Sequence, residues 1–325
     1  MDEHAAVREL LAAPPPSPEA IAAWREQLMT EVNAAEGRGR RRTAVWTSAL
    51  TGLLGAAAAV VMLLTSTPAQ HTTQHTARDI LLAAATEAAK APDQGSWWGV
   101  RLVKGSQYRD PGDRYLLERR RTEETWIPAD PEGSTWIAQQ ELGVEPVTPQ
   151  DEAAWRADGS PATWTYKAGK PGEWYLDAAP GKVELSQTED WDWRVVASGK
   201  PLTGIGQITP EELRGLLGEE QTAMRAAEVV AYYPVSAEVR AAAYRLLASL
   251  SGVSAAGKAT DRLGRTGEAV EYPGAQTDTT ERLIIDPATG AALSIETRTK
   301  GLLTDFTLVQ ESHWADSNPL KKENR

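Results

Sequence analysis

Histidine is scarce in this chain and cysteine is absent, which restricts the chemistry its side chains can perform. His71 and His75 stand four residues apart, a spacing that lets two imidazoles share a metal on one helix face, but their Thr and Gln neighbours supply no third ligand. The sequence has no nucleophile elbow, no phosphate-binding loop and no HExxH pattern, and the Thr-Gly-Ile-Gly segment at 203–206 lacks the third glycine of a dinucleotide loop. We therefore predict no catalytic residue, no cofactor site, no metal site and a non-enzymatic function.

Tryptophan is the unusual residue type, because the chain has 12 tryptophans and one phenylalanine. Trp191 and Trp193 are two residues apart, as are Trp164 and Tyr166, so each pair shares one face of a strand. Such rings serve either a hydrophobic core or the wall of a ligand groove. The groove hypothesis places an acyl chain, a lipoprotein or a cell-wall fragment on the concave face of a curved sheet. Its candidate residues are Trp97, Trp164, Tyr166, Trp191 and Trp193.

A second candidate surface is an amphipathic helix near the N-terminus. Ser17 is a good N-cap and Pro18 suits the first helical position. The apolar side of this helix has no apolar partner within its own segment. The helix therefore docks to a cytoplasmic protein, lies on the membrane surface or belongs to a poorly ordered tail. The apolar residues at helical spacing, which form the predicted partner face, are Ile21, Trp24, Leu28 and Val32.

An uncharged run at 44–64 predicts a membrane span. A helix needs roughly 20 apolar residues to cross a bilayer core, and the four arginines within 38–42 favour a cytoplasmic N-terminus and an external C-terminal part. The alternative is a cleaved signal peptide with a cleavage site at 67–69. The acidic segment before the run is too long for a signal peptide, which favours a retained single-pass anchor in the cell membrane.

The composition beyond the span fits an outward-facing domain. The residues from 66 onward have a net charge of −10, which disfavours nucleic acid as a partner because phosphate binding needs a basic face. No disulfide can support the fold, but a domain of this length buries enough surface without one. The predicted parts are a cytoplasmic tail at 1–43, a transmembrane helix at 44–65, a linker at 66–76, an extracytoplasmic domain at 77–318 and a disordered tail at 319–325.

Local patterns predict an α+β fold for this domain, with a curved antiparallel sheet and packed helices. Apolar periodicity and capping residues predict helices at 77–91, 223–232 and from 237, and Thr209-Pro210 begins another. Asp286 and Gly290 bound a hairpin loop. Because short turns join neighbouring strands, the sheet should be antiparallel. The predicted strands are 97–103, 114–128, 134–139, 162–166, 173–176, 191–197, 268–272, 281–285, 291–299 and 302–311.

Several of these segments together resemble an actinobacterial, Streptomyces-like family of uncharacterised single-span membrane proteins. They are the SPEAIAAWREQL helix, the arginine cluster with its Ala-rich span, ARDILLAAATEAA, YYPVSAEVRAAAYRLLASLSGV and the hairpin RLIIDPATGAALSIET. This resemblance implies a regulatory protein encoded near extracytoplasmic-function sigma factors, and it supplies no catalytic residue. The order of elements also resembles, by analogy, the lipoprotein-carrier fold shared with sensors of sigma-factor systems.

These observations predict a membrane-anchored extracytoplasmic sensor or regulator of unknown ligand, accessory to a sigma-factor system. The expected partners are the lipid bilayer, a cytoplasmic regulatory protein and a lipid or cell-envelope ligand. The tail offers only His4 and no cysteine as metal ligands, so a sigma-factor contact would be metal-free. The alternative function is a tethered carrier of lipid, lipoprotein or another apolar ligand.

Overall fold

The computed structural model describes residues 75–323 except 131, 169–171, 190–201 and 203. The described residues belong to the unit His71–Arg325, one of the two units into which the chain divides. Within the described ranges no helix is long and apolar enough to cross a membrane. The predicted span at 44–64 and the predicted tail helix lie outside those ranges.

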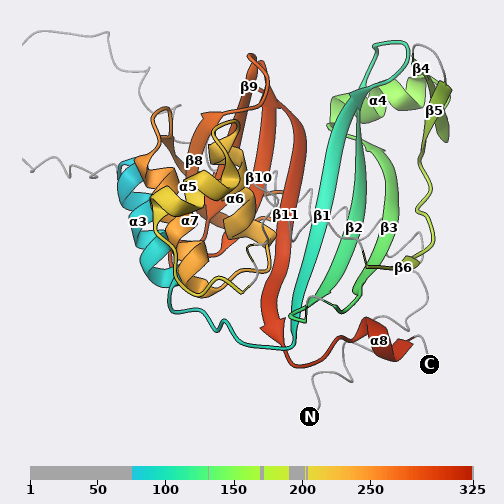
Figure 1. The fold of residues 1–325 in the computed structure, drawn as a ribbon. Coiled ribbons are helices and arrows are strands. Elements are labelled where there is room, and N and C mark those ends of the chain that lie inside the picture. The colour runs from blue at the N-terminus through green and yellow to red at the C-terminus, as the bar shows by residue number, and fades with distance from the viewer. Residues whose placement is uncertain (1–74, 131, 169–171, 190–201, 203, 324–325) are drawn as a thin grey trace, which may run out of the picture. The chain divides into compact units, whose positions relative to one another are not determined.

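The described part of the chain is α+β and is built on a large curved antiparallel sheet of nine strands (Figure 1). Its strands follow the spatial order β6-β3-β2-β1-β11-β10-β9-β8-β7, so the first and last long strands, β1 and β11, are neighbours at its centre. The strands are β1 (Trp97–Arg109), β2 (Leu116–Pro128), β3 (Thr135–Pro146), β6 (Glu184–Thr188), β7 (Ser254–Thr260), β8 (Thr266–Pro273), β9 (Thr279–Ile285), β10 (Ala292–Thr299) and β11 (Leu302–Ala315).

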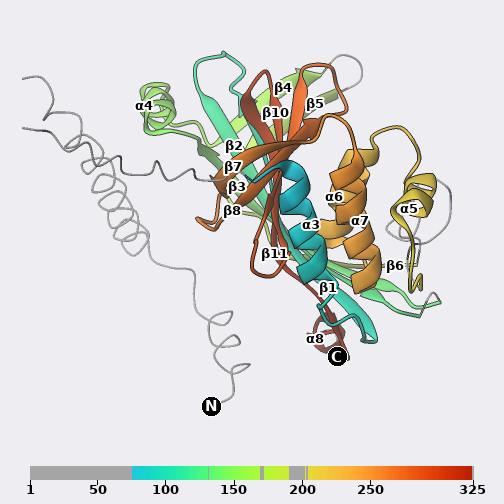
Figure 2. The ribbon, with the colours of Figure 1, turned by 90° about the vertical axis from the view of Figure 1, so that its left-hand side faces the viewer.

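Four helices pack on one face of this sheet, beside strands β8 to β11 (Figures 1 and 2). Thr209 and Ser236 cap α5 and α7 as predicted, each accepting a backbone N–H from three residues onward. Apolar side chains of the four helices meet those of the strands in the main core, where Leu81, Tyr244 and Leu283 are fully buried. The helices are α3 (Ala77–Ala88), α5 (Pro210–Leu217), α6 (Thr222–Tyr232) and α7 (Ala237–Ser249).

A second, two-stranded sheet lies over one end of β2 and β3. It consists of β4 (Thr163–Ala168) and β5 (Gly172–Asp177), and helix α4 (Pro149–Ala157) precedes it. A separate apolar cluster joins these elements to the large sheet, with Leu117 and Val144 from the sheet and Trp164 from β4. The hairpin and α4 therefore cover the same sheet face as the four helices, because Leu117 and Val144 belong to the alternating positions that point there.

Three hairpin turns of the large sheet begin with aspartate. The carboxylates of Asp110, Asp261 and Asp286 each accept the backbone N–H of the residue two positions onward, at 2.8–3.0 Å. Such Asx turns fix a hairpin without a tertiary contact. The turn at 286–290 was predicted from its sequence and is confirmed.

Arg265, at the end of the β7–β8 turn, ties this hairpin to the centre of the sheet. Its Nε donates to Asp261, its Nη1 to the carbonyl of Val309 at 2.7 Å and its Nη2 to the carbonyl of Leu293 at 2.8 Å. The β9–β10 pairing shifts register at Leu293, and the β1–β11 pairing shifts immediately after Val309. Arg265 therefore satisfies carbonyls beside two bulges.

The opposite sheet face holds a tryptophan cluster. Trp126 and Trp136 are buried there, Trp97 packs against them, and Leu320 of α8 (Leu320–Glu323) closes the cluster. The sequence predicts disorder from 319 onward. In the structure a helical turn forms at this point instead, because Leu320 finds an apolar site on β3.

Most predicted elements are present with small shifts in their ends. β1, β3 and β11 extend further than predicted, and β6, β7 and α4 were not predicted. The predicted strand at 191–197 lies outside the described residues.

Candidate functional site

A row of polar side chains crosses the helix-bearing face of the sheet near one end of its strands, close to the start of β11 and the end of β1. Direct cross-strand partners point to the same face, so the pairing register defines the row without ambiguity. Starting at β8 and ending at β2, its members are Tyr272, Glu281, Thr297, Asp305, Ser106 and Arg119. We call these six residues the polar row.

Hydrogen bonds link neighbouring members of the polar row. Thr297 donates to Glu281 at 2.9 Å, and Ser106 donates to Asp305 at 2.7 Å. The Tyr272 hydroxyl, at the covered end of the row, is buried and has no hydrogen-bond partner within the described part of the chain. The row thus passes from a buried end beneath the helices to an accessible end at β1 and β2.

Buried acids lie near the covered end. Burial raises the pKa of Glu281, a hydrogen bond from Thr297 opposes that rise, and the charges of Asp305 and Glu228 reinforce it. Burial likewise raises the pKa of Glu228 on α6, against a hydrogen bond from Tyr232 and the nearby charges of Arg225 and Lys104. Both carboxyl groups therefore titrate above the ordinary range of glutamate.

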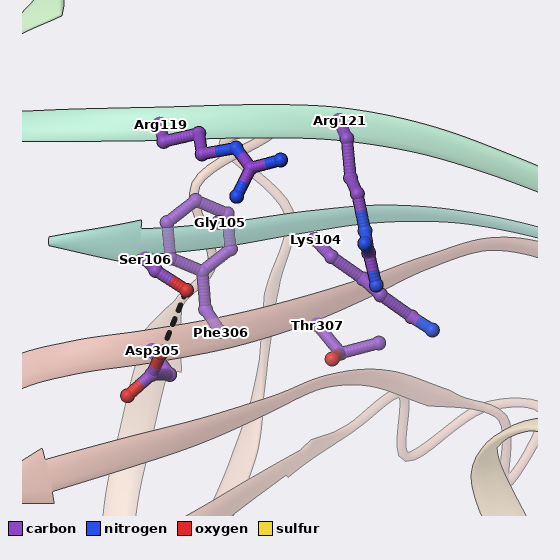
Figure 3. A pocket seen from close by; sticks show the side chains of 8 residues that line it. All are labelled: Lys104, Gly105, Ser106, Arg119, Arg121, Asp305, Phe306 and Thr307. Carbon is purple, nitrogen blue, oxygen red and sulfur yellow. Dashed lines mark hydrogen bonds between the residues drawn. The ribbon is translucent and has the colours of Figure 1, made fainter. Parts of the chain in front are cut away.

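The accessible end of the row opens into a hollow of about 270 Å³, shown in Figure 3. Arg119 and Arg121 project from β2, Lys104 and Ser106 come from β1, and the opposite wall belongs to β11. We call this the sheet-face hollow. Its lining residues are Lys104, Gly105, Ser106, Arg119, Arg121, Asp305, Phe306 and Thr307.

The three cations that line the sheet-face hollow are held by nearby carboxylates, two of them by one shared glutamate. Lys104 contacts the buried carboxylate of Glu123 at 2.9 Å, and Arg121 lies 3.8 Å from the same residue. Arg119 binds Glu141 side-on through Nε and Nη2, with a distance of 2.8 Å at Nε. This bond to Glu141 raises the pKa of Arg119. The hollow therefore offers donors and acceptors side by side, without a strong net charge.

A second pocket of about 420 Å³ adjoins the hollow and shares Arg119 with it. Arg119 and Glu141 lie on its sheet side, and Trp174 and Tyr175 of β5 form its outer wall. We call this the hairpin pocket. Its volume lies within the range of about 300–1,000 Å³ that is usual for small-molecule sites.

Aromatic stacking fixes the outer wall of the hairpin pocket. The ring of Trp174 stacks on Tyr166 at 4.1 Å with an interplanar angle of 9°, and Tyr108 contacts it at 5.3 Å and 59°. The Tyr166 hydroxyl donates to the carbonyl of Arg109 at 2.7 Å. Burial raises the pKa of Tyr166 to about 12, so this phenol stays neutral and keeps its proton for that bond.

The segment 178–181 closes the third side of the hairpin pocket. Gly181 donates its N–H to the carbonyl of Glu141 at 2.8 Å, and Gln140 donates back to the carbonyl of Gly181 at 3.1 Å. Gly143 has φ +86°, and a Cβ atom there would overlap the carbonyl oxygen of Ala178. Glycine at 143 therefore permits both the backbone conformation and the close approach of this segment.

The structure separates the residues of the predicted apolar groove. Trp164 is buried beside Tyr115, and Tyr166 lies in the same cluster with its ring against Trp174. Trp97 lies on the opposite face of the large sheet, in the cluster of Trp126. Trp191 and Trp193 lie outside the described residues, as do the four residues predicted to contact a cytoplasmic partner.

The sequence did not identify the residues that line the hollow and the pocket. It indicated only that tryptophan is unusually frequent, and Trp174 of the hairpin pocket is one of these tryptophans. Charged residues fill positions 118–121, 123 and 124 of β2, on both faces of the strand, and this density of charge was the available signal for a polar strand. Among the described residues, no group of three or more His, Asp or Glu side chains is placed to hold a metal ion.

Comparison with known proteins gives distant likenesses only. No family model matches the chain, so the resemblance to the actinobacterial membrane family stays a prediction. No curated protein matches it either.

Two solved structures are similar to part of the chain. One is the complex of MucA and MucB from Pseudomonas aeruginosa, at 13% identity and TM-score 0.28, where the match covers 75% of this chain and 59% of that chain. The other is a DUF1329 family protein from Desulfovibrio piger, at 11% identity and TM-score 0.20, covering 73% of this chain and 91% of that chain. At these values the likeness carries no argument for a shared function.

Proposed function

We propose that this chain is a single-pass membrane protein whose outer domain binds a polar ligand of the cell envelope and acts as a sensor or regulator, accessory to a sigma-factor system. The ligand site is inferred from one observation: the sheet-face hollow and the hairpin pocket meet at Arg119. The proposal of an anchored, external domain rests on the uncharged run at 44–64 and its preceding arginines.

The balanced charges decide which ligand fits. An acyl chain laid over Arg119 and Glu141 would desolvate both groups and return no hydrogen bond. A ligand rich in hydroxyl, amide or zwitterionic groups can bond to both members of each pair. The alternative function as a carrier of an apolar ligand is therefore less well supported than binding of a polar one.

Reporter fusions test the topology. A fusion after Gly37 should report the cytoplasm, and one after Asp93 should report the exterior. Both reporters on one side, or a mature chain that starts near residue 70, would contradict the anchored arrangement.

Ligand retention tests the site. The full chain, embedded in phosphatidylcholine nanodiscs, is incubated with a soluble digest of actinobacterial cell envelope, and mass spectrometry identifies the retained small molecules. We expect wild-type protein and an Arg109→Gln control to retain the same molecules, because Arg109 is exposed and lies outside the hollow. The variant Arg119→Gln should lose them, because Arg119 lines both the hollow and the hairpin pocket. Equal retention by Arg119→Gln, or no retention by wild type, would refute the site.

A further inference from the structure

The open surface of the hairpin pocket is an aromatic wall beside a charged pair. One face of Trp174 is covered by Tyr166, yet 37% of the residue remains exposed where it lines the pocket. Tyr175, the next residue, is 69% exposed and lines the same pocket. Consecutive strand residues point to opposite faces, so a pocket that touches both lies along the edge of β5.

That edge adds backbone hydrogen-bonding groups. In the described part of the chain β5 pairs with β4 on one side only. Alternate N–H and C=O groups of an edge strand point away from its partner and are available to a ligand. The pocket also includes the carboxylate of Asp177, to which Thr163 donates at 3.2 Å.

The Arg119–Glu141 pair supplies fixed donors and acceptors on the opposite side. Both side chains are about two-fifths exposed, at 39% and 40%, so the pair reaches the solvent within the pocket. The side-on geometry uses Nε and Nη2 of Arg119, and Nη1 is not part of it. The guanidinium plane and the carboxylate plane are thereby held in a known orientation.

We propose that the hairpin pocket binds a pyranose ring of an uncharged or zwitterionic glycan. This proposal rests on the proposed function, because it names the ligand of the same site. A pyranose has one face of C–H bonds and a rim of hydroxyl groups. The C–H face suits the open face of Trp174, and the hydroxyl rim suits Arg119, Glu141 and the edge of β5. Each hydroxyl donates and accepts, which matches a wall that presents both kinds of group.

Other ligand classes fit this pocket less well. A polyanion would meet the carboxylates of Glu141 and Asp177 in the same pocket, with Arg119 as the one cation among its lining residues. An aliphatic chain would leave the polar side of the pocket without partners. A neutral or zwitterionic glycan is thus favoured because the pocket combines a stacked indole with a polar wall that presents both hydrogen-bond donors and acceptors.

Calorimetric titration of the full chain in phosphatidylcholine nanodiscs tests the proposal, since these discs carry no sugar headgroup. The probes are the N-acetylglucosamine trimer and maltotriose, which separate a cell-wall type of glycan from an α-glucan, and trigalacturonate as an acidic comparison. We expect one of the neutral trisaccharides to bind and trigalacturonate to bind more weakly. Trp174→Ala should weaken the binding by roughly tenfold, the scale expected for loss of a stacked indole.

Two further variants keep the test independent of folding. Tyr175→Ala removes a largely exposed ring and should weaken binding without unfolding the protein, whereas Leu302→Ala, at an exposed site on β11, should leave binding unchanged. Wild-type affinity in both Trp174→Ala and Tyr175→Ala, or no neutral trisaccharide bound, would overturn the glycan assignment. Retention of a non-glycan molecule from the envelope digest would overturn it while leaving the proposed function intact, and retention of nothing would remove both.

Discussion

Replacing Arg265 by methionine should destabilise the described domain more than the matching replacement of Arg114 in the β1–β2 turn. Methionine keeps the apolar stem but removes the donors to Val309 and Leu293 and the partner of Asp261. The Asp261 side chain is fully buried and would keep only the backbone N–H groups of Leu263 and Arg265. Removing one member of a buried ion pair costs about 3–5 kcal/mol, so we expect a loss within that range.

The β1–β2 turn provides a matched control for this prediction. Arg114 pairs with Asp110 at the same spacing, and the Asp110 side chain is equally buried. Asp110 accepts three backbone N–H groups, however, and the bonds of Arg114 go to carboxylates and not to the carbonyl groups of the sheet. Arg114→Met should therefore cost less, about 1–2 kcal/mol, because three hydrogen bonds still satisfy Asp110.

Chemical denaturation of the full chain in nanodiscs, followed by tryptophan fluorescence, measures both effects, since most tryptophans lie beyond residue 96. Arg265→Lys should fall between wild type and Arg265→Met, because one ammonium can hold Asp261 but cannot also reach two separate carbonyls. Equal losses for Arg265→Met and Arg114→Met would show that the bulge carbonyls gain nothing from Arg265 and would refute the reasoning.

Three further predictions concern pH, backbone geometry and the N-terminal segment. Burial raises the pKa of Glu228 above 4.5, so the folded state holds its proton more tightly and wild-type stability should fall as pH rises from about 4.5 through the raised pKa. Glu228→Gln should reduce this fall in pH-dependent denaturation and leave the part that comes from the raised pKa of Glu281, and equal slopes for the two proteins would contradict it. Gly143→Ala should destabilise the domain by at least about 1 kcal/mol and open the hairpin pocket, because Ala178 occupies the space of the new methyl group. Unchanged stability together with unchanged ligand retention would contradict this prediction. Trp24→Ala with Leu28→Ala should abolish capture of a cytoplasmic partner without affecting membrane insertion, and identical captured proteins would argue that the tail is a passive leader.

Helices and turns of this fold were predictable where the capping or turn residues lie within the segment itself. The Thr209-Pro210 start and the Asp286 turn were read from capping and turn chemistry, which act within a few residues. Helix α4 was missed although Thr148-Pro149 repeats the same start, because none of its side chains is buried and its sequence shows no apolar stripe. Strand β7 was missed because its Ala, Gly and Lys residues are mostly exposed and do not alternate.

The candidate site was not predictable in the same way, because it depends on strand order. Ser106 and Asp305 form a hydrogen bond across 199 residues of sequence, and only the pairing of β1 with β11 brings them together. The Arg119 partner Glu141 likewise depends on a register shift between β2 and β3. Periodicity assigns a face to each strand, but it does not say which strands are neighbours.

One row of the sheet changes from apolar to polar where the core meets the sheet-face hollow. The row of cross-strand partners beside the polar row is apolar on β8, β9 and β10 and becomes polar at β11. Its members are Val270, Leu283, Ile295, Thr307, Lys104 and Arg121. Helix α6 contacts β8, β10 and β11, where burial of apolar side chains is favourable, and the charged side chains of β1 and β2 remain to line the sheet-face hollow. Along this row, the change that ends the apolar core also fixes the location of the polar site, whereas β1 contributes Val100 and Leu102 to the core further along the strand. Substitutions that extend the apolar row onto Lys104 or Arg121 should therefore draw the core outward and close the hollow.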